Sequence, residues 1–366
     1  MIMKISAPEH ILSIAPYTPG KPVEELEREY GIQNSVKLAS NENPLGSSPM
    51  AVAAARKVLN SLHRYPDGAA HDLSVKLAGQ LGVKPENIVL GNGSDEVIAL
   101  LTRALLQPGD EAIIPRPSFL MYDITVRSAG ATPVYVPLTK LHIDLDAVKK
   151  SITAATRMIF ICNPNNPTGT VVYKDDMDRF LADLPENIVV VLDEAYLEFV
   201  RDPDAAKGDD YIDETGPIVS LRTFSKAYGL AGMRVGYGIM PSKLSNLLHR
   251  IRLPFNVSLP AQAAAGAALD DDGFLEKSVR LVHEGLEYLY HALDEMGIGY
   301  FATQTNFFLI NVACDAQDVF EKLLMHGIIV RSMRSYGYNE YLRVNVGLPE
   351  ENRRFIAALA KVLARA

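Results

Sequence analysis

The amino-acid sequence predicts an α/β fold in which a mostly parallel central sheet is sandwiched by helices, followed by a smaller α+β domain. Short apolar runs without polar alternation, such as 158–161 and 188–192, predict strands that are buried on both faces. Segments of a dozen or more residues separate most of these runs, as parallel pairing requires. Helices are expected at about 49–61 and 71–81. After about residue 255 the pattern changes to a long helical stretch, 274–296, followed by single helices and short strands, one of them at 328–331.

Length and composition are typical of a soluble globular protein of more than one domain. The 366 residues exceed the ~250–300 at which a single hydrophobic core stops growing. A net charge of −8 argues against a nucleic-acid partner, which requires a basic face. No apolar run approaches the ~18 residues of a membrane helix. The first residues contain no long apolar segment, and the expected location is therefore cytoplasmic.

Domain boundaries are expected at two changes in sequence texture. Residues 1–35, which several prolines interrupt, are predicted to form an N-terminal arm that packs with the small domain or a partner subunit. Residues 36–260 are predicted to form the large domain and residues 261–366 the small one. The two cysteines, Cys162 and Cys314, lie far apart and form neither a disulfide framework nor a metal site, so no metal is expected.

The segment 223–238 carries the strongest chemical signal in the chain. Lys226 follows two hydroxyl residues, Thr223 and Ser225, and precedes Arg234 by eight residues, after the predicted strand 217–221. Lysine is the residue that forms Schiff bases with aldehydes. Hydroxyls and an arginine suit a phosphate group. An aldehyde that carries a phosphate is pyridoxal phosphate, and this cofactor is the hypothesis that the other motifs test.

A glycine-rich turn, 91–96, follows the predicted strand 88–90 and precedes a helix. Glycines there let the backbone approach a ligand, and free N–H groups at a helix start attract an anion. Glu96 occupies the position at which a dinucleotide fingerprint has its third glycine. Two interpretations remain open, a phosphate-binding cup that includes Ser94 and Asp95, and a simple turn with Ser94 as the N-cap.

Asp193 and Tyr196 follow the apolar strand 188–192, at the sheet edge where ligands of open α/β sheets gather. The first interpretation is a magnesium-binding aspartate. It would need a G-x-x-x-x-G-K-[ST] loop, and the sequence contains none. The second interpretation is an aspartate that keeps a pyridine nitrogen protonated, with Tyr196 reaching a ring hydroxyl. The third is a capping or ion-paired aspartate without a ligand.

Two further residues follow predicted strands. Asn166, in the turn 163–169, is expected to donate a hydrogen bond to a cofactor oxygen, although the turn alone also explains the asparagine. Phe119, near the start of a helix, is a candidate for stacking on an aromatic ring, with core packing as the alternative. The convergence of these groups at successive strand ends favours one shared ligand.

Several motifs occur in an order that resembles a known family. They are 40–44 (SNENP), 64–66 (RYP), 93–96 (GSDE), 165–169 (NNPTG), 193–196 (DEAY) and Ser225-Lys226 through Arg234. The sequence resembles the aspartate-aminotransferase-like, fold-type I pyridoxal phosphate enzymes over essentially its whole length. Within them it is most similar to the histidinol-phosphate aminotransferase family, which acts in histidine biosynthesis.

The resemblance implies roles for individual residues. Lys226 would be the Schiff-base lysine, Asp193 would pair with the pyridine nitrogen, and Phe119 would stack on the ring where many relatives have tyrosine. Tyr196 and Asn166 would contact the ring hydroxyl oxygen. The phosphate would bind to Ser94, Asp95, Thr223, Ser225 and Arg234, and to Tyr65 of the partner subunit in a homodimer.

On the substrate side, the resemblance implies roles for Tyr17, Asn43, Arg331 and Arg343. Two arginines suit a phosphorylated amino alcohol and also glutamate, whose two carboxylates need two cations; a surface arginine is the alternative for Arg331. The expected reaction is transamination between histidinol phosphate and 2-oxoglutarate. An aromatic amino-acid aminotransferase, a threonine-phosphate decarboxylase on the same scaffold and a non-enzymatic nucleotide-binding α/β protein remain as alternatives.

Overall fold

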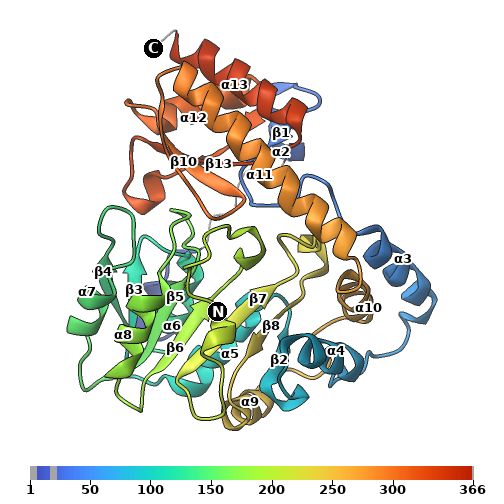
Figure 1. Cartoon of the computed structure of the whole chain (residues 1–366), viewed down its shortest axis with the longest axis vertical. Helices are drawn as coiled ribbons and strands as arrows, with labels where there is room; N and C mark the ends of the chain where they lie inside the picture. Colours follow the sequence, from blue (N-terminus) through green and yellow to red (C-terminus); the bar gives the residue numbers. More distant parts are fainter. Residues whose placement is uncertain (1–5, 17–22, 365–366) are drawn as a thin grey trace, which may run out of the picture.

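The structure, a computed structural model, describes residues 6–16 and 23–364, and Figure 1 shows two lobes joined by a long helix. Within these residues, seven strands form the central sheet of the larger lobe in the order β2-β8-β7-β6-β5-β3-β4. Their bounds are β2 Ile88–Gly91, β3 Glu111–Arg116, β4 Thr132–Pro137, β5 Thr156–Cys162, β6 Val189–Asp193, β7 Ile218–Thr223 and β8 Gly236–Ile239. In this sheet of the described chain, β8 runs antiparallel to both of its neighbours, β2 and β7, and the other neighbouring strands pair in parallel. The expected mostly parallel sheet is therefore confirmed.

Helices cover both faces of this sheet. Val191 and Val219 pack on the face of α5 (Ser94–Leu105), α6 (Leu120–Ser128) and α9 (Ser242–His249). Val190 and Ile218 pack on the opposite face, against α7 (Leu145–Lys150) and α8 (Lys174–Ala182). Successive side chains of a strand point to opposite faces, so strands that are covered on both sides read as continuous apolar runs. A third cluster joins β2 and β8 to α3 (Pro49–Val58), α4 (His71–Leu81) and α10 (Leu259–Ala268).

The smaller lobe is built on a second sheet, whose four described strands are antiparallel in the order β12-β13-β10-β9. The strands are β9 Gly299–Phe301, β10 Phe307–Asn311, β12 Arg331–Ser332 and β13 Tyr341–Asn345. The helices α11 (Asp272–Glu295), α12 (Ala316–Met325) and α13 (Pro349–Leu363) pack on it around one core. This lobe is the expected α+β unit.

The N-terminal segment contacts both lobes. The helix α1 (Glu9–Leu12) lies against α6. The helix α2 (Val23–Tyr30) packs through Leu26 against Ile329 of the small lobe. Further along, β1 (Val36–Lys37) pairs in parallel with β11 (Ile328–Ile329). The division of the chain into 1–35, 36–260 and 261–366 stays a prediction.

Local sequence signals explain where several elements begin and end. Ser48 caps α3 by accepting a bond from Ala51 N, and Pro49 occupies the first turn, where its missing N–H costs nothing. The expected helix 71–81 matches α4, which ends at Gly82 in a left-handed conformation (φ 68°). The helix α11 begins next to the large lobe. There its N-cap Asp271 accepts a hydrogen bond from Ser48 Oγ, which precedes α3, at 2.5 Å.

Some expected boundaries differ from the structure. The predicted helix 49–61 is α-helical only to Val58, and its last turn is a 3₁₀ segment. The predicted strand 328–331 is two strands, because the chain leaves β1 after Ile329 and pairs with β13 from Arg331. The short 3₁₀ turns are η1 Leu59–Ser61, η2 Pro85–Asn87, η3 Leu197–Phe199, η4 Gly208–Asp210, η5 Ala231–Met233 and η6 Arg334–Tyr336.

Two structural features are absent from the described residues. Among residues 6–16 and 23–364, no helix combines the length and apolar character of a membrane span. The same part of the chain contains no cluster of three or more histidine, cysteine, aspartate or glutamate side chains arranged to hold a metal ion.

Candidate active site

A cavity of about 410 Å³ lies where the carboxyl ends of the parallel strands meet the small lobe. Most of the predicted site residues line it, namely Ser94, Asp95, Phe119, Asn166, Asp193, Tyr196, Thr223, Ser225, Lys226, Arg234, Arg331 and Arg343. The topology explains this gathering, because β5, β6 and β7 run in the same direction and therefore end at one edge of the sheet.

One end of the cavity is a cup of backbone amides and a cation. Gly93 has a positive φ of 80°, which favours glycine, and a Cβ at this position would lie 2.5 Å from Arg234 Nη2, so the guanidinium would have to shift. Ser94 begins α5, whose first N–H groups have no partner within the helix. Arg234 donates to Ser225 Oγ at 3.4 Å and to Asp95 Oδ2 at 3.3 Å. This combination suits an anion.

The wall of the cavity contains a buried carboxylate at the end of β6. Asp193 accepts a hydrogen bond from the Tyr122 hydroxyl at 2.6 Å and one from Ala195 N at 3.2 Å. Burial raises the pKa of Asp193 to about 6, while the hydrogen bond from Tyr122 acts in the opposite direction. The pKa of Asp193 therefore lies not far below neutral pH, and a cation in the cavity would stabilise the ionised carboxylate.

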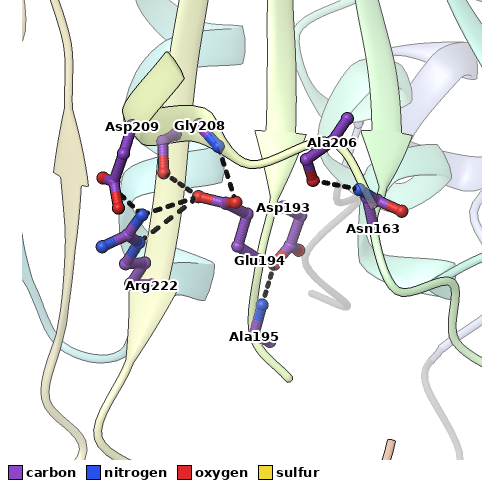
Figure 2. A network of polar contacts seen from close by, with 9 residues as sticks. Asn163, Asp193, Glu194, Ala195, Ala206, Gly208, Asp209 and Arg222 are labelled. Carbon is purple, nitrogen blue, oxygen red and sulfur yellow. Dashed lines mark hydrogen bonds and ion pairs between the residues drawn. The ribbon is translucent and has the colours of Figure 1, made fainter. Parts of the chain in front are cut away.

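The next residue, Glu194, belongs to a different environment. Its Oε2 accepts bonds from Ser220 Oγ at 2.5 Å and from Arg222 Nη2 at 3.2 Å, and its Oε1 accepts from Gly208 N at 2.8 Å. Figure 2 shows the Glu194 carboxylate directed at Gly208 and Arg222. Arg222 is also bonded to Asp209 at 2.7 Å. Glu194 does not line the cavity, and its bonds hold β6, β7 and the η4 turn together.

Lys226 lies after β7, and its side chain enters the cavity. Nζ donates to the carbonyl oxygen of Ser40 at 3.5 Å and lies 5.8 Å from the centroid of the Tyr196 ring. Burial, together with the positive charge of Arg343, lowers the pKa of Lys226 to about 8. A lysine in this state is neutral in an appreciable fraction near neutral pH and is then a nucleophile and a base.

Tyr196 and Asn166 are held by partners on other segments. The Tyr196 hydroxyl accepts a bond from Asn41 Nδ2 at 2.7 Å, and burial raises the pKa of this phenol, which keeps its proton. Asn166 Oδ1 accepts a bond from Arg343 Nη1 at 2.6 Å, which leaves the amide N–H₂ of Asn166 to donate to a ligand.

Phe119 is the N-cap residue of α6 and lines the cavity. Its ring meets Tyr122 edge to face, with centroids 5.6 Å apart and an interplanar angle of 87°. A flat aromatic ligand in the cavity would therefore find one aromatic side chain supported from behind by another.

Two arginines from the small lobe also line the cavity. Arg331 on β12 and Arg343 on β13 are directly paired in the antiparallel register. Residues in such a pair project from the same face of the sheet with Cβ atoms about 5 Å apart. Arg343 is 7% exposed and donates to the carbonyl oxygen of Ala39 at 2.8 Å, with its guanidinium 5.0 Å from the Phe307 ring centroid. The two cations give this part of the cavity a positive charge that suits an anion.

Two described residues of the predicted site, Asn43 and Tyr65, are not among those that line the cavity. Asn43 Nδ2 donates to Ala227 O at 2.9 Å and to Ser278 Oγ at 2.8 Å, so its side chain anchors the 40–46 segment beside Lys226. Tyr65 is 81% exposed and stacks on Phe255, with centroids 4.6 Å apart. Tyr17 lies outside the described residues.

The cavity also contains residues that sequence reasoning missed. Asn41, Glu42, Cys162 and Tyr336 line it, and Tyr122 contacts it through Asp193. Asn41 and Glu42 lie inside the SNENP motif, so their position next to Asn43 was an available signal. Burial raises the pKa of the Cys162 thiol to about 12, so it stays protonated and takes no part as a nucleophile.

Comparisons with known proteins agree with this geometry. Residues 33–359 match the family described as aminotransferase class I and II. The chain is 44% identical to the histidinol-phosphate aminotransferase of Moorella thermoacetica, over 97% of this chain and 92% of that protein. Its fold is similar to that of the Thermus thermophilus aspartate aminotransferase double mutant, with a TM-score of 0.83 at 21% identity, over 98% of this chain and 100% of that chain. The expected aspartate-aminotransferase-like fold is thereby confirmed.

A solved structure with a bound cofactor is similar over the whole chain. It is the histidinol-phosphate aminotransferase of Sinorhizobium meliloti in complex with pyridoxal-5'-phosphate, with a TM-score of 0.90, 27% identity and coverage of 99% of both chains. The chain therefore belongs to the class I and II aminotransferase family, in which its relatives at 44–46% identity are histidinol-phosphate aminotransferases.

Proposed function

We propose that this protein is a pyridoxal phosphate-dependent transaminase that interconverts histidinol phosphate and 2-oxoglutarate with imidazole-acetol phosphate and glutamate. One observation carries the proposal: a single cavity is lined by an anion-binding cup of the large lobe, by a register-paired set of arginines from the small lobe and by Lys226. A cofactor phosphate and a substrate phosphate would then have separate sets of partners. Curated relatives that match nearly the whole chain support the choice of substrate.

The residues of the cavity fit pyridoxal phosphate in charge and in shape. Gly93 forms a cradle against Arg234 that a Cβ would fill, and the adjacent start of α5 supplies donors for a phosphate. The donor set on the other side includes Asp193, a buried carboxylate suited to a protonated ring nitrogen. A site for a metal ion would not need both the phosphate donors and the Asp193 carboxylate.

We propose the following contacts between this chain and the cofactor. The phosphate would be held by Ser94, Asp95, Thr223, Ser225 and Arg234, the ring nitrogen by Asp193, and the ring oxygen by Tyr196 and the Asn166 amide. Phe119 would cover one face of the ring, and Lys226 Nζ would hold the cofactor covalently. When bound, the cofactor supplies an electron sink for the charge that develops as the substrate loses its α-proton.

Lys226 is proposed to transfer the proton. The free Lys226 amine has a pKa of about 8, close to neutral pH, and would be available as a base when it does not hold the cofactor. An amine with this pKa can accept the proton from the substrate Cα and return it to another carbon. The carbonyl oxygen of Ser40, 3.5 Å from Nζ, orients the amine.

Arg331 and Arg343 are proposed to bind the anionic end of each substrate. Guanidinium groups bind phosphate and carboxylate in a two-pronged geometry. Histidinol phosphate places a phosphate there, and glutamate places its second carboxylate there. Tyr17 remains a proposed contact of the substrate, while Asn43 is proposed to act indirectly, by holding the 40–46 segment against Ala227.

A homodimer is proposed from the exposed aromatic pair Tyr65–Phe255. The ring of Tyr65 is held by stacking although it is 81% exposed, and Leu62 and Leu253 are 57% and 65% exposed. An apolar patch of this kind is typical of a protein–protein contact. In the dimer, Tyr65 would reach the cofactor phosphate of the other subunit. The cytoplasmic location stays a prediction.

The half-reaction tests the proposal. The protein loaded with pyridoxal phosphate is mixed with histidinol phosphate, and separately with phenylalanine, while absorbance follows conversion of the cofactor from the aldehyde to the amine form. Fast conversion by histidinol phosphate and slow conversion by phenylalanine is the expected result. Fast conversion by phenylalanine alone would contradict the assignment and favour an aromatic amino-acid aminotransferase. Lys226→Ala, the control, should convert with neither.

A decarboxylase on the same scaffold is separated by its product. A threonine-phosphate decarboxylase releases CO₂ from phosphothreonine and returns the cofactor as the aldehyde. We expect no CO₂ release with phosphothreonine in the same assay. Arg343→Ala should weaken the use of histidinol phosphate and leave the visible absorbance of the cofactor intact, since Arg343 belongs to the substrate end.

A further inference from the structure

Tyr122 is a fully buried tyrosine behind the wall of the cavity. Its ring stacks on Phe160 with centroids 4.5 Å apart and an interplanar angle of 13°, and Phe119 contacts it edge-on at 5.6 Å. Two aromatic neighbours therefore hold the ring from two directions. The hydroxyl that projects from this fixed ring donates to Asp193 Oδ2 at 2.6 Å.

This hydrogen bond has a fixed direction. Burial, and then the negative charge of Asp193, raise the pKa of the Tyr122 phenol well above its ordinary value. The phenol therefore keeps its proton and acts as the donor, and a hydroxyl that donates to a carboxylate forms a short, charge-assisted bond. Ala195 N holds the other oxygen, Oδ1, at 3.2 Å. With a bond to each oxygen, the plane of the carboxylate is set.

We propose that Tyr122 is a positioning residue that keeps the Asp193 carboxylate ionised and oriented for a cationic ring nitrogen in the cavity. The inference deepens the proposed function and rests on it, because the ring nitrogen belongs to the proposed cofactor. Burial favours the neutral form of Asp193 and raises its pKa to about 6. The Tyr122 hydroxyl is the strongest influence that lowers this pKa, followed among the hydrogen bonds by Ala195 N.

The other groups around Asp193 do not replace this hydroxyl. The negative charges of Asp95 and Glu194 both raise the pKa of Asp193. Cys162 stays a neutral thiol. The titratable side chains that interact electrostatically with Asp193 are Asp95 from α5, Tyr122 from α6, Cys162 from β5, and Glu194 and Tyr196 from its own segment, while Lys226 lines the same cavity.

The test compares Tyr122→Phe with the parent protein. This change keeps the ring and its packing on Phe160 and removes only the hydroxyl. The dissociation constant of pyridoxal phosphate is measured from pH 5 to 9 by absorbance titration of the cofactor-free protein. We expect affinity about tenfold weaker at pH 7, the loss of one hydrogen bond to a charged group. The decline of affinity on acidification should begin at a higher pH than in the parent, because Asp193 protonates more readily.

A matched control is Tyr135→Phe. Tyr135 also donates its hydroxyl to an aspartate, Asp123, but neither residue lines the cavity. We expect this control to bind pyridoxal phosphate as the parent does at every pH. The thermal midpoint of each cofactor-free variant shows that it is folded before its affinity is compared.

A double-mutant cycle distinguishes action through Asp193 from a general effect on packing. Asp193→Asn removes the charge and keeps the shape, so Tyr122→Phe should change the affinity by less than about twofold in that background. An equal loss in both backgrounds, or an unchanged pH dependence of Tyr122→Phe, overturns the inference. In turnover, kcat should fall while KM for the amino donor changes little. If the parent does not bind pyridoxal phosphate at all, the proposed function fails; if only the Tyr122→Phe effect is absent, this inference alone fails.

Discussion

Asp193 and Glu194 are consecutive carboxylates at the end of β6, and their surroundings differ completely. Asp193 lines the cavity and accepts its bonds from neutral groups, the Tyr122 hydroxyl and a backbone N–H. Glu194 lies on the other face of the sheet and is paired with Arg222 at 3.2 Å, with side-chain exposures of 0% and 8% (Figure 2). One carboxylate is left to meet a cation from outside the chain, and the other already has its cation.

The alternation of side chains along a strand causes this difference. Val191 packs with the α5 and α6 face, as Asp193 does through Tyr122, whereas Val190 and Leu192 pack with the α7 and α8 face. Side chains at odd and even positions of β6 therefore pack against different helix layers. At the end of the strand, Asp193 is directed to one face of the sheet and Glu194 to the other. Residue type alone does not separate a binding carboxylate from a structural one; the face of the sheet does.

Breaking the structural pair should have the largest effect on stability. Glu194→Gln leaves the Arg222 guanidinium buried with Asp209 as its remaining charged partner. Removal of one partner of a buried ion pair costs about 3–5 kcal/mol, so we expect at least about 3 kcal/mol less free energy of unfolding in urea. Activity per folded molecule should change by less than about tenfold, since Glu194 does not contact the cavity.

The double variant Glu194→Gln/Arg222→Met separates burial of a charge from loss of packing. Without the arginine, no unpartnered charge stays behind, so part of the lost stability should return. If the double variant is no more stable than Glu194→Gln, the cost arises from packing around β6 and β7, and the role given to the ion pair is wrong.

The cavity-facing neighbour should behave in the opposite way. Asp193→Asn removes the charge proposed to hold the ring nitrogen, and loss of one such electrostatic group lowers kcat by about 10²–10³-fold. The thermal midpoint of the cofactor-free protein should stay the same or rise, because burial disfavours the ionised carboxylate. Steady-state kinetics and thermal denaturation of the same samples check this. A fall in thermal midpoint like that of Glu194→Gln would mean that Asp193 is mainly structural.

The difference between the two carboxylates was only half visible in the sequence. Lys226, Asp193 and Arg234 could be predicted because each stands beside a recognisable strand end, and strand ends of a parallel sheet meet at one edge. The pairing of Glu194 with Arg222 could not, because it depends on which faces of β6 and β7 the two residues occupy.

Other parts of the site depend on three-dimensional packing that no local pattern encodes. Tyr122 occupies an ordinary helical position in the sequence, and only the packing of α6 against β5 brings it to Asp193. The pairing of Arg331 with Arg343 follows from the register of β12 on β13. Asn43 matches a family motif, yet its amide is engaged with Ala227 and Ser278.

Lys226 is a buried cation of the cavity, and its replacement should change the free energy of unfolding by less than Glu194→Gln does. Its pKa is about 8 in the folded protein and 10.5 ordinarily, chiefly through burial. The folded state therefore disfavours the charged amine, a penalty fully present below pH 8 and relieved as pH rises from 8 to 10.5. Lys226→Met should raise the free energy of unfolding of the cofactor-free protein at pH 7 by about 1–2 kcal/mol while abolishing transamination.

The measurement for Lys226→Met is thermal and urea denaturation of both cofactor-free proteins at several pH values. The advantage of the variant should be largest at pH 7 and should shrink above pH 8, where the parent lysine loses its proton on folding. If the stability advantage of Lys226→Met grows with pH, or if the variant is less stable than the parent at pH 7, burial of the Lys226 ammonium group does not destabilise the folded protein as proposed.

An exposed ion pair supplies the smallest expected effect and isolates the role of burial. Lys149 and Asp183, from α7 and the segment after α8, are 2.9 Å apart, closer than Arg222 and Glu194 at 3.2 Å, but their side chains are 36% and 78% exposed. Water screens such a pair, so Lys149→Met should change the free energy of unfolding by less than about 1 kcal/mol. Urea denaturation of Lys149→Met beside Glu194→Gln gives the ratio directly. Equal losses would mean that the distance between charges, rather than their burial, determines what an ion pair contributes here, and the contrast between the two faces of β6 would then lose its physical basis.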